Sequence, residues 1–331
     1  MIKALVTGAG GFLGGAIARE LMARGDQVRS LQRGDYPGLR ALGVETIRGD
    51  LADPEAVRRA VEGCEVVFHV AAKAGIWGPY ADYYRANVEG TRNVINACLA
   101  SGVSRLVYTS SPSVVFNGRD MENVDESAPY PAHFEAPYPA TKAQAERLAL
   151  GANGSDLAVV ALRPHLIWGP GDNHLLPRII ARARAGRLWK IGGGDSLIDA
   201  TYVVNAVEAH LQAADRLSAG SKPAGKAYFI AQGEPIPVWD LIDRFLAAAD
   251  LPPLKRSVPA WAASLAGGTC ELVYGALGIT REPPMTRFLA RELATSHWFN
   301  LDAARRDLDY RPRVSTDEGL ARLRIWLRTQ P

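Results

Sequence analysis

The opening residues place glycines at every third position directly after a short apolar run. That run is Ala4-Leu5-Val6, and the next segment reads Thr7-Gly8-Ala9-Gly10-Gly11-Phe12-Leu13-Gly14. Between a strand and a helix, such glycines allow a tight turn, close approach of the backbone to a pyrophosphate, and close helix–strand packing. The helix N-terminus then favours the negative charge of a diphosphate, although glycines also make plain turns. We therefore expect a dinucleotide to bind at Gly8, Gly11, Phe12, Leu13 and Gly14.

The first half of the chain alternates short apolar runs with longer periodic segments. This alternation predicts a parallel sheet with helices on both faces, the doubly wound Rossmann architecture. We expect residues 1–170 to form the nucleotide-binding domain and residues 171–331 a smaller, interwoven substrate lobe. Strands are predicted at 3–7, 28–31, 46–47, 66–70, 106–108 and 159–162, and helices at 12–24, 83–100, 138–150, 175–185, 203–214 and 238–249.

Composition excludes several classes of protein. The chain has 331 residues, 47% of them hydrophobic and 22% charged, which is typical of a folded globular protein. The net charge of +3 comes without a basic run, so we expect no nucleic-acid partner. The three cysteines are far apart and lack metal-ligand spacing, so we expect neither a disulfide framework nor a bound metal. No secretory leader is recognisable, and we expect a cytoplasmic protein.

The end of the second predicted strand bears on the choice of cofactor. NAD-selective Rossmann proteins place an acidic residue there for the ribose 2′-hydroxyl. This chain instead reads Leu31-Gln32-Arg33-Gly34, without a carboxylate. The guanidinium of Arg33 can pair with a 2′-phosphate, which favours NADP(H). The alternative is a solvated surface arginine.

A tyrosine and a lysine lie four residues apart at the start of a predicted helix, in Tyr138-Pro139-Ala140-Thr141-Lys142. This spacing puts the phenol and the ammonium on one helix face. A free phenol has a pKa near 10, so a nearby cation helps it to exchange protons near neutrality. The pattern also arises by chance, but lysine is scarce here and Ser111, at a predicted strand end, lies 27 residues earlier.

These motifs together resemble the extended branch of the short-chain dehydrogenase/reductase superfamily. The resemblance implies catalysis by Ser111, Tyr138 and Lys142, with the serine holding the substrate oxygen and the lysine also binding the nicotinamide ribose. It implies that Asp50 and Leu51 lie at the adenine. Further cofactor contacts are implied for Ala71, Ala72 and Lys73, and for Pro164, His165 and Ile167 of the segment Leu162-Arg163-Pro164-His165-Leu166-Ile167-Trp168-Gly169-Pro170. The alternative for His165 is a packing role.

Within that branch, the chain resembles the 3β-hydroxysteroid dehydrogenase-like group over nearly its whole length. The segments concerned are Tyr108 to Phe116, Arg163-Pro164-His165 and Gly233 to Trp239. It looks most like the members that reduce a 2-alkyl-3-oxoalkanoic acid with NADPH in bacterial long-chain olefin biosynthesis. The resemblance implies a lipid-like β-keto acid as substrate, a homodimer, and a complex with other enzymes of that pathway. The alternatives are an NAD(P)-dependent 3β-hydroxysterol dehydrogenase and a catalytically silent cofactor-sensing regulator.

One long segment in the second half is almost free of charge. Residues 258–280 contain Glu271 and no other charged side chain. The length is marginal for a membrane span, and a proline, paired glycines and the central glutamate weaken that interpretation. We expect a helical lid over an apolar substrate pocket, with membrane-surface contact and buried core as the alternatives.

Overall fold

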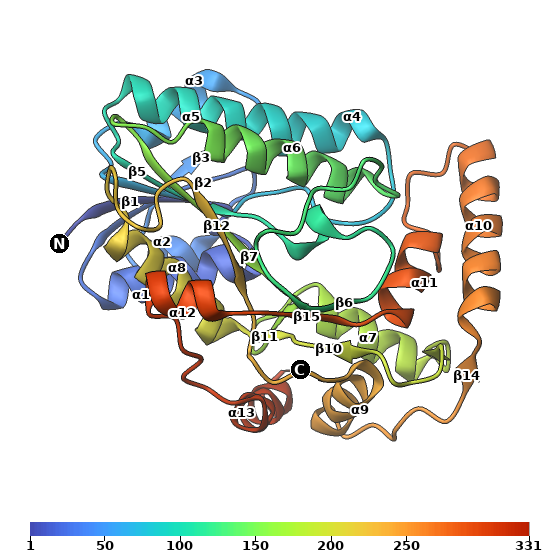
Figure 1. Ribbon diagram of the computed structural model, residues 1–331. Helices are drawn as coiled ribbons and strands as arrows, with labels where there is room; N and C mark the ends of the chain where they lie inside the picture. The colour runs from blue at the N-terminus through green and yellow to red at the C-terminus, as the bar shows by residue number, and fades with distance from the viewer. Residues whose placement is uncertain (331) are drawn as a thin grey trace.

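A seven-stranded, all-parallel sheet forms the centre of the computed structural model, which describes residues 1–330 (Figure 1). Its spatial order is β12-β7-β5-β4-β1-β2-β3. The strands are β1 (Lys3–Thr7), β2 (Gln27–Gln32), β3 (Glu45–Arg48), β4 (Val66–His69), β5 (Arg105–Thr109), β7 (Ala158–Pro164) and β12 (Lys226–Ile230). The order reverses between β1 and β4, which is where ligands bind in doubly wound sheets. The predicted Rossmann fold is confirmed.

Helices cover both faces of this sheet because its central strands are apolar on both sides. One face carries α3 (Pro54–Val61), α5 (Gly90–Ala100) and α6 (Pro137–Gly151), whose buried side chains form one core with alternate residues of the strands. The opposite face carries α1 (Phe12–Ala23) and α8 (Val203–Arg216) and has its own, larger core (Figure 1). The short helix α2 (Pro37–Ala41) follows β2.

The second half of the chain contributes directly to the sheet. Strand β12, which the sequence analysis did not predict, adds the last parallel strand beside β7, and Tyr228, Phe229 and Ile230 are buried there. Helix α8 packs against α1, β5 and β7. The two halves are therefore woven together in the sheet layer.

Most of the remaining elements form a smaller layer beside the main sheet (Figure 1). A four-stranded sheet has the order β13-β10-β15-β6, and β11 pairs with β8 and β14 with β9. The strands are β6 (Met121–Val124), β8 (Ile167–Trp168), β9 (Lys190–Ile191), β10 (Leu197–Ile198), β11 (Thr201–Tyr202), β13 (Ile236–Pro237), β14 (Ser257–Val258) and β15 (His297–Phe299). The helices of this layer are α7 (Leu175–Arg184), α9 (Val238–Ala248), α10 (Ala260–Ala276), α11 (Arg287–Ala294) and α13 (Thr316–Arg328). Helix α12 (Asp302–Leu308) instead packs against α8 and β12 of the main sheet layer.

The helix predicted at 83–100 is not uniform. It consists of α4 (Tyr80–Tyr83), the π-helical stretch η1 (Tyr84–Glu89) and α5. A π-helical stretch changes the side of the helix on which the following side chains lie, and such stretches are frequent at functional sites. Here it places Asn87, which is buried, towards the 71–73 segment. The 3₁₀ turn η2 (Pro112–Val115) similarly redirects the chain after β5.

Most of the apolar segment 258–280 forms α10, which stands at the edge of the molecule and packs against α11 (Figure 1). Only Ala263 and Gly267 of this helix are buried, whereas Trp261, Leu265 and Leu272 are each more than 60% exposed. This exposure contradicts the buried-core alternative. None of the helices within residues 1–330 combines the length and apolar character that crossing a bilayer requires.

We expect Leu265→Asp on α10 to leave the free energy of unfolding within about 0.5 kcal/mol of the native value, because the side chain is exposed. Urea denaturation of the two proteins measures this difference. A loss above about 2 kcal/mol would show that Leu265 is covered in solution. The lid stays a prediction, and kcat/KM of this variant for long against short β-keto acids tests it.

Candidate active site

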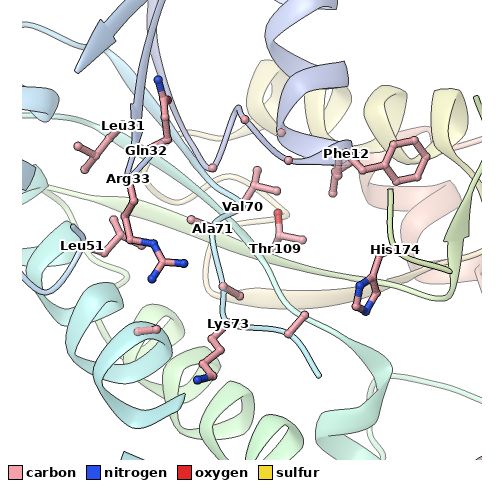
Figure 2. Close-up of a pocket in the computed structure, with 18 of the residues that line it drawn as sticks. Phe12, Leu31, Gln32, Arg33, Leu51, Val70, Ala71, Lys73, Thr109 and His174 are labelled. Atoms are coloured by element: carbon pink, nitrogen blue, oxygen red, sulfur yellow. The ribbon is translucent and has the colours of Figure 1, made fainter. Parts of the chain in front are cut away.

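One cavity of about 1000 Å³ opens at the carboxyl ends of β1, β2, β4 and β5 (Figure 2). Most of the residues predicted to bind cofactor or to catalyse lie in its wall. They are Gly8, Gly11, Phe12, Leu13, Gly14, Arg33, Asp50, Leu51, Ala71, Ala72, Lys73, Ser111, Tyr138, Pro164 and Ile167. Lys142 and His165 are not among the wall residues, and Leu166, the residue after His165, lines the cavity.

The glycine-rich turn has no room for side chains at Gly8 and Gly14. A Cβ at Gly8, where φ is +73°, would lie 2.9 Å from the Cα of Ala71, and one at Gly14 would lie 2.4 Å from the carbonyl oxygen of Gly8. Gly11 donates its N–H to the same carbonyl over 2.9 Å, and α1 begins at the next residue. The turn therefore leaves the helix N-terminus open to the cavity, and this geometry fits a dinucleotide diphosphate.

A buried hydrogen-bond chain, absent from the sequence predictions, holds the neighbouring 70–71 backbone. The hydroxyl of Thr91 donates to the carbonyl of Asn87 over 2.6 Å, so Nε2 of His69 donates to Thr91 over 3.0 Å. Nδ1 of His69 then accepts from the hydroxyl of Thr7, which lies 2.9 Å away. Burial and the charge of Lys142 lower the pKa of His69 to about 3 and keep the ring neutral.

The oxygen of Thr7 completes this chain by accepting the N–H groups of Val70 and Ala71, each over 3.1 Å. The donor and the acceptor of every hydrogen bond in this network are therefore fixed. The result is a rigid wall at the point where β4 ends and the cavity begins.

Asn87 fixes the next part of that wall. Its Oδ1 accepts the N–H of Lys73 over 2.7 Å, and its Nδ2 donates to the carbonyl of Lys73 over 3.2 Å and to the hydroxyl of Thr141 over 3.0 Å. One amide therefore connects the 71–73 segment to α6, which carries Tyr138. The ammonium of Lys73 pairs with Asp82 at 3.0 Å.

The predicted adenine end lies at Asp50 and Leu51. Asp50 accepts the N–H of Ala52 over 3.0 Å, and the carbonyl of Leu51 accepts from Nδ2 of Asn93 over 2.8 Å. A Cβ at Gly90 would lie 2.9 Å from the Cβ of Leu51, so α5 approaches this loop closely.

Arg33 lies at the same end, and its side chain points into the cavity (Figure 2). It is exposed, and Nε of Arg48 donates to its carbonyl over 3.1 Å. The neighbouring Gln32 extends in another direction (Figure 2), and its buried Oε1 has no hydrogen-bond partner among the described residues. The nearby carboxylate of Asp35 is paired with Arg40. Arg33 therefore lies at the cavity wall without a carboxylate from β2 beside it.

Ser111 and Tyr138 come together from β5 and α6. Ser111 follows the end of β5 by two residues and caps η2, accepting the N–H of Ser113 over 3.2 Å, and its hydroxyl lies 2.9 Å from that of Ser113. Burial raises the pKa of Tyr138 to about 12, a hydrogen bond with Ser111 opposes this shift, and the charge of Glu292 adds to it. The phenol thus keeps its proton at neutral pH, as a general acid must.

Lys142 lies one helical turn after Tyr138 but is buried behind the cavity wall. Its ammonium donates to the carbonyl of Thr109 over 2.6 Å and lies 4.2 Å from the ring centroid of Tyr108. Burial lowers the pKa of Lys142 to about 7, and the negative charge of Glu146 opposes that shift. An ammonium has three donors, so contact with a cofactor ribose stays a prediction that this geometry permits.

A buried ion pair supports the same helix. Glu146, one turn beyond Lys142, accepts from Nε and Nη2 of Arg163 over 3.0 and 2.6 Å, and both side chains are almost fully buried. The hydroxyl of Tyr130 donates to Glu146 over 2.6 Å. The sequence analysis did not predict the buried carboxylate of Glu146. Its negative charge lies behind Lys142 and favours the ammonium form of that lysine.

His165 has the packing role that was the alternative interpretation. Its Nδ1 lies 2.9 Å from the carbonyl oxygen of Asp199, and its ring packs edge-on against Phe299. Burial lowers the pKa of His165 to about 4. The imidazole therefore lies behind the wall, and Leu166, with φ of +38°, and Ile167 line the cavity instead.

Sequence analysis also missed several wall residues, among them Tyr36, Arg85, Asn173 and His174. A Cβ at Gly10 would overlap the ring of Tyr36, so this aromatic side chain lies directly over the glycine-rich turn. None of the four belongs to a motif, and only their place in the fold brings them to the cavity.

Comparison with known proteins gives this chain its family. Residues 5–259 match the 3-beta hydroxysteroid dehydrogenase/isomerase family. The chain belongs to this family, and is thus an oxidoreductase of the short-chain dehydrogenase/reductase type that acts on a hydroxyl or ketone group.

Among individual relatives, the 2-alkyl-3-oxoalkanoate reductase of Stenotrophomonas maltophilia is 51% identical, with 98% of each chain covered. The protein of the same name from Shewanella oneidensis is 47% identical over 98% of this chain and 86% of its own. Among solved structures, MoeE5 in complex with UDP-glucose and NAD is 27% identical, with a TM-score of 0.74 and 98% of each chain covered.

Proposed function

We propose that this protein reduces the 3-keto group of a 2-alkyl-3-oxoalkanoic acid to the 3-hydroxy acid, using NADPH, in the biosynthesis of long-chain olefins. Similarity over essentially the full length to proteins named for this reduction carries the proposal. The cavity supports it, because Ser111 and Tyr138 lie in the same wall as the glycine-rich turn.

Each residue of the site has its own role in the proposed reaction. The turn from Gly8 to Gly14 would hold a nicotinamide dinucleotide, which would supply the hydride for the keto carbon. The hydroxyl of Ser111 holds the keto oxygen, and Tyr138 donates its proton to that oxygen as negative charge develops there. Lys142 stabilises the resulting phenolate through its positive charge and holds the ribose. Tyr138 recovers its proton from solvent before the next turnover.

NADP(H) is the cofactor we propose, because Arg33 points into the cavity from the end of β2 and no carboxylate of that strand competes for it. A structural relative contains NAD, so the preference for the phosphorylated form rests on Arg33.

An assay of NADPH oxidation with 2-alkyl-3-oxoalkanoic acids of increasing chain length tests the proposal directly. A 3β-hydroxysterol with NAD⁺ is the comparison, since relatives named for sterol substrates also match this chain, although less closely. We expect turnover of the keto acids and none of the sterol. Turnover of the sterol alone would favour the sterol dehydrogenase, and turnover of neither would favour a cofactor-sensing regulator.

We further propose a homodimer formed by α5 and α6, and association with other enzymes of the olefin pathway. Val88, Val94 and Ile95 are buried within the subunit, whereas Leu148 and Leu150 are only partly buried and can contribute to the dimer contact. Leu99 of α5 is 46% exposed and adds to this surface. Sedimentation at micromolar concentration should show a dimer, and a single monomeric species would contradict it.

A further inference from the structure

His174 occupies a fixed place at the wall of the active-site cavity, opposite Phe12 of the glycine-rich turn (Figure 2). It comes directly before α7. The buried carboxylate of Asp172 accepts the N–H of His174 over 2.8 Å, of Leu175 over 3.1 Å and of Leu176 over 2.9 Å. The backbone at His174 is therefore anchored, while its side chain is exposed.

The imidazole of His174 has no hydrogen-bond partner among residues 1–330. Other basic groups in or behind the wall are engaged: the ammonium of Lys73 pairs with Asp82, and that of Lys142 donates to the carbonyl of Thr109. The guanidinium of Arg85 lies 3.8 Å from the carboxylate of Asp50. Arg33 lies at the adenine end (Figure 2). His174 thus offers two ring nitrogens to a ligand in the part of the cavity that the cofactor adenine does not occupy.

The proposed substrate carries a charge that this part of the cavity must accommodate. In a β-keto acid the carboxylate is separated from the keto carbon by a single carbon atom. When Ser111 and Tyr138 hold the keto oxygen, the carboxylate must lie within the same chamber, a few ångströms away. A carboxylate removed from water needs donors, and those of Ser111 and Tyr138 already serve the keto oxygen.

We propose that His174 recognises the carboxylate of the substrate and so makes the enzyme selective for β-keto acids over uncharged ketones of the same shape. This inference rests on the proposed function. A charge-assisted hydrogen bond of this kind changes affinity by about tenfold to a hundredfold. His174 is a specificity-determining residue in this scheme and transfers no proton.

The test compares a freshly prepared 2-alkyl-3-oxoalkanoic acid with its methyl ester, at saturating NADPH, in the native enzyme, His174→Ala and His174→Asn. For His174→Ala we expect KM for the acid to rise about tenfold to a hundredfold while KM for the ester changes less than about threefold. Asparagine keeps a neutral donor and should recover part of the loss. His133→Ala removes another exposed histidine, outside the cavity wall, and should leave both KM values unchanged.

Three outcomes separate the possibilities. An equal loss for acid and ester in His174→Ala would overturn the role in carboxylate recognition. A weaker Kd for NADPH in that variant, measured by fluorescence titration, would assign the histidine to the cofactor and would also overturn the inference. If the native enzyme reduces neither acid nor ester, the proposed function itself fails, independently of His174.

Discussion

Replacing Tyr138 with phenylalanine should lower kcat by about a hundredfold to ten-thousandfold, because the phenol supplies the proton that the developing alkoxide takes up. The affinity for NADPH should change little, since the hydroxyl acts on the substrate oxygen. Burial raises the pKa of Tyr138 to about 12, so the acid form is present throughout the neutral range. We therefore expect that titration of Tyr138 causes no rise in the native kcat as the pH falls from 8 to 6.

Single-turnover kinetics with excess enzyme separate this step from product release. Tyr130→Phe provides a matched control, because that hydroxyl donates to Glu146 and lies outside the cavity wall. The Tyr130→Phe variant should retain most of the native kcat even if its free energy of unfolding falls. A native kcat in Tyr138→Phe would exclude the phenol as the proton donor.

The fold could be predicted because the sequence patterns that indicate its central elements lie within short segments. Each of the central strands is a short apolar run, and the turn after β1 needs glycine at Gly8 and Gly14 for reasons of space alone. Strand β12 was missed because Lys226 to Ile230 follows a loop with one proline and two glycines, and only pairing with β7 distinguishes it. The break of the helix at η1 was missed because its consequence, the contact of Asn87 with Lys73, spans 14 residues.

The site residues also divide into those that a local sequence pattern predicts and those that it does not. Residues within motifs, such as Ser111 and Tyr138, could be placed on the cavity wall from spacing and resemblance. The groups that hold these residues in place could not. His69 reaches Thr7 across 62 positions of sequence, and Arg163 reaches Glu146 across 17. Such pairs carry no local pattern, because their geometry arises only when the strands and helices are assembled.

The cofactor preference gives the second large expected effect. We expect Arg33→Ala to lower the ratio of kcat/KM for NADPH over NADH by about tenfold to a hundredfold, which corresponds to a charge-assisted contact worth about 1.5–3 kcal/mol. The loss should lie almost wholly in the NADPH value, because NADH lacks the phosphate that the guanidinium binds. Steady-state kinetics with both cofactors measure the ratio.

Arg59→Ala is the matched control for this effect, since it removes another exposed guanidinium, from α3 and outside the cavity wall, and should leave the ratio unchanged. Salt is a weaker test than mutation. Because Arg33 is exposed, 0.5 M NaCl should screen part of the attraction in the native enzyme and narrow its preference without showing which residue is responsible. Equal native efficiencies with NADPH and NADH at low salt would contradict the assignment. In that case Arg33 is a solvated surface arginine, and the absence of a carboxylate at the end of β2 needs another explanation.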